Sequence, residues 1–284
     1  MFGPNTHLNF SEVVNFSHRD TKFSSILSDL ESIFVKKFKL DDFDILFLNG
    51  GGTLGVESVI WSSKFEVNVT GPTGTFFSRW KSLSDLHNAG KDTTRKNNLY
   101  CQLETSSGAL SKLSGGFVDS ISSFPYFDLP ECDAFITCSN KQLGSIPGLV
   151  IIGVKKNSWD LFRDSSTFSY LNLARYYEYS KINQTPSTPT YPIMMNLLNL
   201  LEEFDLQNFK DTINLNCEIL QQVFNFENSP VLHIQKEKLS KEFATKWNLY
   251  GLNTNSKEYS IFTYSCKTSD YESFINEIKN EIIL

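Results

Sequence analysis

The sequence predicts an α/β protein with a mainly parallel large-domain sheet flanked by helices, followed by a small α+β C-terminal domain. Short apolar runs typical of buried strands alternate with helical segments along most of the chain, and polar or glycine-rich turns follow several of these runs. The polar stretch 181–190, which contains two prolines, then separates this region from a strongly helical segment. We therefore expect a large domain over residues 1–190 and a small domain over residues 191–284.

Each element is predicted from the spacing of its apolar residues. In the large domain we expect, in order, a helix at 21–39, a strand at 44–48, a helix at 54–63, a strand at 65–70, a helix at 75–87, and strands at 99–103, 116–119, 134–137 and 149–154. In the small domain we expect helices at 191–204 and 208–226, a strand at 231–234, a helix at 238–247, a strand at 259–264 and a helix at 270–283.

Composition excludes several classes of function. The chain has 284 residues, 40% of them hydrophobic and 20% charged, with a net charge of −6 and no dense cluster of basic residues, so no nucleic acid is expected as a partner. Its five cysteines are scattered without metal-ligand spacing, which favours a reduced, cytoplasmic protein without a metal site. The start of the chain does not resemble a signal peptide, and the apolar run 149–154 is too short to cross a membrane.

A glycine-rich loop, Gly50-Gly51-Gly52-Thr53, lies between a predicted strand and a predicted helix. Glycines let backbone N–H groups approach an anion, and the positive end of the helix adds to the attraction, so this loop can hold a phosphate. The alternative is a tight turn without a ligand. No Gly-Lys-Ser/Thr follows the loop, so it does not fit the P-loop of nucleotide-binding proteins.

Two further residues follow strands and carry reactive groups. Asp119 ends the strand at 116–119, and Lys141 comes shortly after the strand at 134–137. Taken singly, the lysine would be read as a solvated side chain and the aspartate as a helix cap or surface group. Together they match the needs of a pyridoxal phosphate enzyme, in which an amine binds the cofactor's aldehyde and a carboxylate keeps the pyridine nitrogen protonated.

With these residues and several further motifs, the chain resembles the class V aminotransferases, and among them most closely the 2-aminoethylphosphonate–pyruvate transaminase branch. The resemblance extends from the N-terminus to about residue 205. It is carried by Gly3-Pro4, His18-Arg19-Asp20, Asn49–Ser58, Gly74–Arg79, Glu104–Gly108, Val118–Phe124, Asp133–Leu149 and Thr188-Pro189-Thr190. It implies the fold-type-I architecture, pyridoxal 5'-phosphate as cofactor and a homodimer with shared active sites.

The resemblance also implies roles for individual residues. Lys141 is expected to be the catalytic residue, which forms the Schiff base and moves a proton on the substrate. The remaining residues expected to bind the cofactor are Gly51, Gly52 and Thr53 at the phosphate, Phe76 stacked on the ring, Thr105 and Ser106 at the phenolic oxygen, Asp119 at the pyridine nitrogen, Ser139, and Thr188 and Thr190, which would reach the phosphate of the partner subunit.

Two departures from the family pattern bear on function. The chain is short for the family, with only about 20 residues between Arg79 and Tyr100. Family members also carry a C-terminal arginine for the substrate carboxylate, whereas the last arginine here is Arg175. Either Arg19 or Arg79 is therefore expected to bind the substrate, or the substrate is not a standard amino acid.

The leading hypothesis is transfer of an amino group from a small amine or amino acid, such as one resembling 2-aminoethylphosphonate, to a 2-oxo acid such as pyruvate. The alternatives are a decarboxylase or lyase with the same cofactor and fold, a non-catalytic binding descendant, and an unrelated α/β protein whose glycine loop holds a nucleotide phosphate.

Overall fold

The computed structural model describes residues 19–279, which form two compact units, residues 19–203 and 204–279. The motif residues Gly3, Pro4 and His18 lie outside the described part of the chain. Helix α5 (Tyr191–Glu203) belongs to the larger unit, although the sequence analysis assigned it to the small domain. It packs along helix α1 (Thr21–Phe38), and the ring centroids of Phe23 and Tyr191 are 6.4 Å apart.

The larger unit is built on a six-stranded sheet with the strand order β1-β8-β7-β6-β3-β2. Its strands are β1 (Phe43–Asn49), β2 (Phe65–Thr70), β3 (Asp92–Cys101), β6 (Phe117–Asp119), β7 (Ala134–Cys138) and β8 (Leu149–Lys155). The pairs β2–β3, β3–β6 and β6–β7 are parallel, whereas β8 is antiparallel to both of its neighbours, β1 and β7. Strand β8 therefore runs opposite to the other five. Strands β4 (Leu103–Glu104) and β5 (Ala109–Leu110) form a separate small hairpin.

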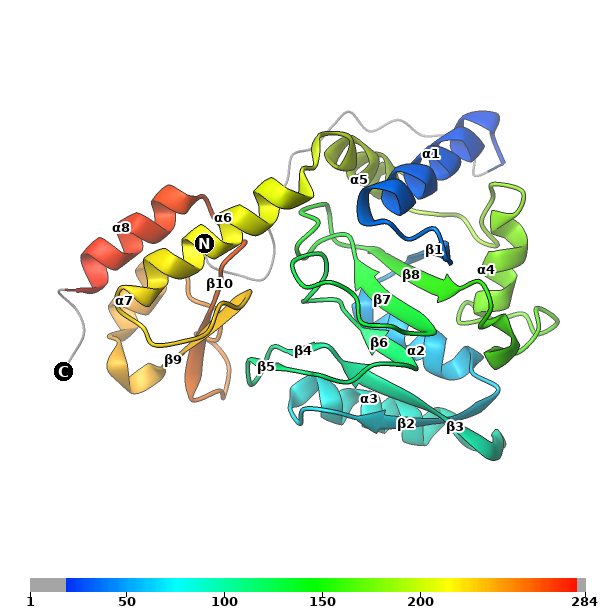
Figure 1. The fold of residues 1–284 in the computed structure, drawn as a ribbon, viewed down its shortest axis with the longest axis horizontal. Coiled ribbons are helices and arrows are strands. Elements are labelled where there is room, and N and C mark those ends of the chain that lie inside the picture. Colours follow the sequence, from blue (N-terminus) through cyan, green and yellow to red (C-terminus); the bar gives the residue numbers. More distant parts are fainter. Residues whose placement is uncertain (1–18, 280–284) are drawn as a thin grey trace. The chain divides into compact units, whose positions relative to one another are not determined.

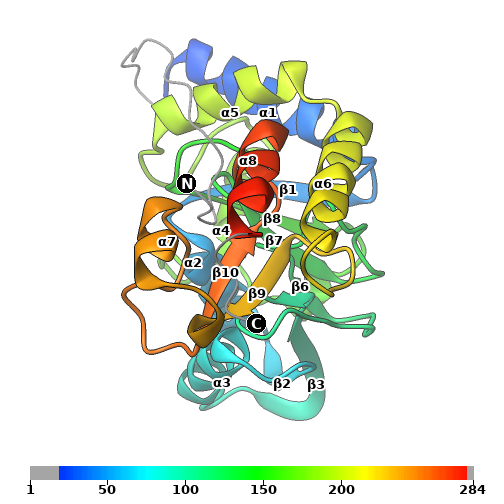
Figure 2. The same ribbon diagram turned by 90° about the vertical axis from the view of Figure 1, so that its left-hand side faces the viewer.

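Helices cover both faces of this sheet (Figures 1 and 2). Helices α2 (Gly52–Ser62), α3 (Thr75–His87) and α4 (Leu173–Ser180) share one hydrophobic core with the sheet, while α1 and α5 lie together on the other side. The connections also contain a single helical turn at Trp159–Leu161.

Alternation along the strands divides the core between the two faces. Leu46 and Leu48 of β1 contact the core under α2, and the intervening Phe47 is buried as well. On the α1 side, Phe34 packs against Phe124, whose ring stacks on that of Phe135 with centroids 5.9 Å apart. Full burial of one such side chain stabilises the fold by about 1.5–3 kcal/mol.

The smaller unit has its own core and a two-stranded antiparallel sheet of β9 (Val231–Gln235) and β10 (Glu258–Phe262). Its helices are α6 (Leu206–Gln221), α7 (Lys241–Lys246) and α8 (Thr268–Ile278), with a single turn at Lys236–Lys238. Alternate residues of the sheet, such as Leu232 and Ile261, contact Phe274 and other apolar residues of the helices.

The predicted order of the main helices and strands is confirmed, apart from short elements such as strand β5 and the turn at Trp159–Leu161, and with two larger differences. Strand β3 begins at Asp92 rather than at residue 99, because its polar first half pairs only with β2 and leaves most of its side chains exposed. Helix α4 was not predicted; it is only eight residues long, and the side chain of Asn172 caps it by accepting a hydrogen bond from the amide of Ala174. Within residues 19–279, no helix has the length and apolar character needed to cross a membrane.

Candidate active site

Strands β1, β3, β6 and β7 run in the same direction, and their carboxyl ends lie at one edge of the sheet. The loops that follow them surround a cavity of about 330 Å³. Ligands of open α/β sheets bind at this edge, and this volume falls at the lower end of the range for small-molecule sites. The buried strands have nearly all-apolar side chains. The charged groups of this region therefore lie at the strand ends and in the loops around the cavity.

One wall of the cavity is the glycine loop between β1 and α2. Gly50 has a φ of +143°, which favours glycine, and its N–H donates to the carbonyl of Gly148 at 2.9 Å. Gly51 is the N-cap residue of α2 and has no side chain to accept from the first amides of the helix. A Cβ on Gly52 would lie 2.4 Å from Cδ1 of Ile121, so only glycine lets the helix start this close to the strand ends. The loop therefore presents open amides, as an anion site requires.

A cation stands beside this helix start. Arg79 of α3 lines the cavity, and its Nη1 donates to Oγ1 of Thr53 at 3.4 Å. The same guanidinium lies 5.3 Å from the ring centroid of Phe76, which also lines the cavity. An anion at the start of α2 would meet backbone amides, a hydroxyl and this guanidinium together.

Asp119, the last residue of β6, is a buried carboxylate in the wall of the cavity. Its Oδ1 accepts from the amide of Ile121 at 3.0 Å, and its Oδ2 accepts from Nε1 of Trp80 at 2.8 Å and from the thiol of Cys101 at 3.4 Å. Burial raises the pKa of Asp119 to about 6, although these three donors oppose the rise. The group is therefore mostly ionised at neutral pH and could hold a proton on a basic nitrogen.

Lys141 lies in the turn between β7 and β8 and lines the same cavity as Asp119. Burial lowers the pKa of its amine, against the smaller opposing influence of Cys138 and Asp119. A lower pKa increases the fraction of neutral, nucleophilic amine. The turn is closed by its own backbone bonds, since the carbonyl of Lys141 accepts from the amide of Gly144 at 3.1 Å.

The cavity thus brings together seven of the residues singled out in the sequence, and they are Gly51, Gly52, Thr53, Phe76, Arg79, Asp119 and Lys141. Ser139 does not line it. Its buried hydroxyl donates to the carbonyl of Ile146 at 2.6 Å, and its carbonyl accepts from the amide of Ser145, so it shapes the turn that carries the lysine.

Thr105 and Ser106 lie in the turn between β4 and β5 and are outside the cavity lining. The hydroxyl of Ser106 donates to Glu104 at 2.6 Å and accepts from the amide of Thr75 at 2.9 Å. Ser106 therefore contacts the start of α3, and its role at the phenolic oxygen of the cofactor stays a prediction.

Thr188 and Thr190 are held beside the glycine loop of their own chain. Nδ2 of Asn49 donates to the carbonyl of Thr188 at 2.6 Å, while Oδ1 of Asn49 accepts from the amide and the hydroxyl of Thr190 at 2.7 and 2.9 Å. Arg19 lies elsewhere: its guanidinium donates to Gln184 and lies 5.3 Å from the ring centroid of Tyr179, and it does not line the cavity.

The sequence analysis assigned no role to three residues that shape the site. Trp80 and Cys101 both donate to Asp119, and the fully buried Glu104 accepts from the amides of Phe76 and Phe77 at 3.0 and 2.9 Å. Glu104 thereby caps α3 from a distant strand. The spacing of Phe76 and Trp80, four residues apart on a predicted helix, could have indicated that Trp80 shares the face of Phe76.

Comparison with solved structures identifies the architecture. An aspartate aminotransferase of subgroup IV from Thermus thermophilus matches with a TM-score of 0.74 and 16% identity over 98% of each chain. A phosphoserine aminotransferase from Cytophaga hutchinsonii matches with a TM-score of 0.75 and 16% identity over 93% of this chain and 90% of that chain. A phosphoserine aminotransferase from Trichomonas vaginalis with bound pyridoxal phosphate matches with a TM-score of 0.72 and 14% identity, over 93% and 90% of the two chains.

The protein has the fold-type-I aminotransferase fold. This confirms the fold class that the sequence predicts. No protein-family model and no curated protein sequence matches the chain. At 14–16% identity, the likeness establishes the fold-type-I architecture. The chemistry of the cavity depends on the residues that line it.

Proposed function

We propose that the protein is a pyridoxal-phosphate-dependent aminotransferase. The observation that carries the proposal is the pairing of Lys141 and Asp119 in one cavity, at the ends of neighbouring strands, with the open N-terminus of α2 in the same wall. A half-buried amine of lowered pKa and a buried carboxylate that is ionised at neutral pH are the two groups that this cofactor requires of a protein.

The donor set of the cavity fits pyridoxal phosphate. The amides of Gly52 and Thr53, the hydroxyl of Thr53 and the guanidinium of Arg79 would hold the phosphate. Phe76 would pack on the ring, and Asp119 would pair with the ring nitrogen. Bound there, the cofactor supplies an aldehyde that condenses with amines and a ring that accepts electrons from a neighbouring carbon.

The protein's own residues then have three tasks. Lys141 would hold the aldehyde carbon of the cofactor through its amine, and the same amine would serve as the base that moves a proton during the reaction. Asp119 keeps a proton on the ring nitrogen, since a negative charge beside the nitrogen stabilises its protonated form. The apolar wall formed by Phe76, Trp80 and Ile121 excludes water from the ring.

The substrates that we propose are a small amino donor of the 2-aminoethylphosphonate type and a 2-oxo acid such as pyruvate. This choice rests on the resemblance described above and on the small volume of the cavity. We also propose a cytoplasmic homodimer in which the segment at Thr188–Thr190 extends to the partner's phosphate. Because Asn49 fixes the threonines next to the glycine loop of their own chain, this proposal requires the two phosphate sites to lie close together across the dimer interface.

The test of the proposed function is cofactor binding by the purified wild-type protein. We expect the protein to take up pyridoxal phosphate with a visible absorbance band, and borohydride to fix the cofactor irreversibly. Adding amino donors with detection of the oxo product then distinguishes transamination from decarboxylation or elimination. A protein that takes up no pyridoxal phosphate from solution would overturn the proposal.

Arg79 allows a sharper prediction about the phosphate. We expect Arg79→Met to raise the dissociation constant of pyridoxal phosphate about 10- to 100-fold, because hydrogen bonds to charged groups contribute about 1.5–3 kcal/mol. Equilibrium dialysis measures this constant. The matched control is Arg175→Met, since Arg175 lies 4.7 Å from the ring centroid of Phe168, outside the cavity.

The same experiment separates the two roles open to Arg79. An unchanged cofactor dissociation constant combined with a raised KM for the 2-oxo acid would contradict phosphate binding. It would instead return Arg79 to the role of substrate-binding residue that the sequence analysis expected.

A further inference from the structure

Trp80 is a buried tryptophan whose one polar atom points at a reactive carboxylate. The side chain is 1% exposed and lines the cavity, and its Nε1 donates to Oδ2 of Asp119 at 2.8 Å. An indole N–H is a donor only, so this contact can form only with an acceptor and is strongest with an ionised one.

Trp80 is also the strongest side-chain donor to Asp119. Among the described residues, the two other groups that donate to this carboxylate are the amide of Ile121 and the thiol of Cys101. The amide bond is fixed by the backbone and lies on the other oxygen, and a thiol is a weak donor at 3.4 Å. The direction in which Oδ2 points therefore depends mainly on the indole.

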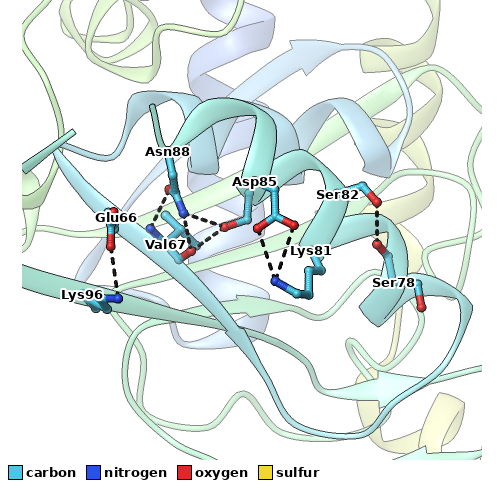
Figure 3. A network of polar contacts seen from close by, with 9 residues as sticks. Glu66, Val67, Ser78, Lys81, Ser82, Asp85, Asn88 and Lys96 are labelled. Carbon is cyan, nitrogen blue, oxygen red and sulfur yellow. Dashed lines mark hydrogen bonds and ion pairs between the residues drawn. The ribbon is translucent and has the colours of Figure 1, made fainter. Parts of the chain in front are cut away.

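Helix α3 holds the indole in place because the helix is fastened at both ends. At its start, Glu104 accepts from the amides of Phe76 and Phe77. At its end, the side chain of Asn88 accepts from the amide of Val67 at 2.9 Å and donates to the carbonyl of Val67 at 3.0 Å, as Figure 3 shows. These contacts bind the helix to two elements of the larger unit, β4 and β2.

The two faces of α3 differ in character. Lys81 and Asp85 form an exposed ion pair at 3.2 Å on the outer face, also seen in Figure 3. Phe76 and Trp80, one turn apart, both line the cavity, with ring centroids 6.0 Å apart. One face of α3 thus carries both Phe76, whose ring is expected to stack on the cofactor, and Trp80, whose indole N–H donates to Asp119.

We propose that Trp80 is the positioning residue for Asp119: its indole N–H orients the carboxylate toward the cavity and keeps it ionised, so that α3 sets both the stacking of the cofactor ring and the partner of its nitrogen. This inference rests on the proposed function. The contact itself exists without the cofactor, so it can be tested in the apoprotein.

The pKa that a titration measures for Asp119 depends on the ionisable groups around it. The titratable groups that act on Asp119 are Cys101 of β3, Glu104 of β4, and Cys138 and Lys141 at the end of β7. Burial raises the pKa of both thiols, that of Cys138 to about 11 and that of Cys101 well above its ordinary value, so neither titrates near pH 6. Trp80→Phe leaves all four groups in place and removes the indole donor together with the second ring of the side chain, while it keeps an aromatic ring at this position.

The experiment is a carboxylate titration of the apoprotein by carbon NMR, with the Asp119 resonance assigned through its loss in Asp119→Asn. We expect the pKa of Asp119 to rise by about one unit in Trp80→Phe, the shift that corresponds to loss of one charge-assisted hydrogen bond. The matched control is Trp159→Phe, because Nε1 of Trp159 donates to Asp44 at 2.7 Å in the same way, away from the cavity. It should leave the pKa of Asp119 unchanged.

A second measurement needs no substitution at Trp80. In the wild-type apoprotein, the indole N–H resonance of Trp80 should shift with the same midpoint as the Asp119 carboxylate. Equal Asp119 pKa values in wild type and Trp80→Phe, or an indole resonance that does not follow the carboxylate, would overturn the positioning role. A wild-type protein that binds no pyridoxal phosphate would instead overturn the proposed function, whatever the titration shows.

Discussion

Lys141→Ala should lose transaminase activity by at least about a thousand-fold and should no longer be labelled when borohydride is added to the protein with pyridoxal phosphate. The reason is that the variant lacks both the amine that binds the aldehyde and the base that moves the proton. Intact-protein mass spectrometry measures the label, and peptide mapping of the wild type should place it on Lys141. The control Lys156→Ala, at the opposite edge of the sheet, should retain activity and labelling.

Another lysine with a lowered pKa, the buried Lys91, provides a strict test of this prediction. Burial lowers the pKa of Lys91 to about 8, so its amine is also reactive near neutral pH. Its Nζ donates to the carbonyl of Ile60, however, and it does not line the cavity. A label on Lys91 in place of Lys141 would show that general amine reactivity, and not the cavity, directs the cofactor.

Asp119→Asn should lower kcat by about 100- to 1,000-fold, the range found when one preorganised electrostatic contact is removed from an active site. Asparagine keeps an oxygen that can accept from Trp80 but has no charge to hold a proton on the ring nitrogen. Steady-state kinetics at saturating pyridoxal phosphate measures the effect, and Asp119→Glu is the charge-preserving control. An unchanged kcat in Asp119→Asn would contradict the role assigned to the carboxylate.

The same substitution should stabilise the apoprotein at neutral pH. Burial raises the pKa of Asp119 from 3.8 to about 6, so between these values the folded chain keeps a proton that the unfolded chain releases. The free energy of unfolding of the wild-type apoprotein therefore falls as the pH rises through this window. The total decrease is about 3 kcal/mol for a pKa shift of about two units. Urea unfolding of both apoproteins should show the variant's advantage growing from about pH 4 to pH 7. An advantage that does not depend on pH would contradict this account.

Residues that follow strands were the most predictable part of the site. Asp119 and Lys141 come at or just after short apolar runs, and parallel strands bring their carboxyl ends to one edge whatever the detailed packing. The glycine loop was predictable for the same reason, because Gly51 and Gly52 stand between a strand and a helix. In these cases the local sequence, together with the handedness of the connections between parallel strands, determines where the residue lies.

Contacts between distant segments were not predictable in this way. Glu104 caps α3 from 28 residues away, and Trp80 reaches Asp119 across 39 residues. Their positions depend on how α3 packs, which hydrophobic spacing does not specify. For Arg19, the predicted role stays a prediction. Its place in a family motif suggested a contact with substrate, but the guanidinium lies against Tyr179, away from the cavity.

The reversed direction of β8 has a consequence for how the chain can vary. Because β8 returns beside β7, the lysine-bearing segment 139–148 is the loop of a hairpin, whereas the parallel neighbours β2 and β3 are joined through a whole helix. Ladder bonds brace the turn on both sides, and its last glycine, Gly148, accepts the N–H of Gly50. An insertion in this turn would thus displace the amine and the glycine loop together.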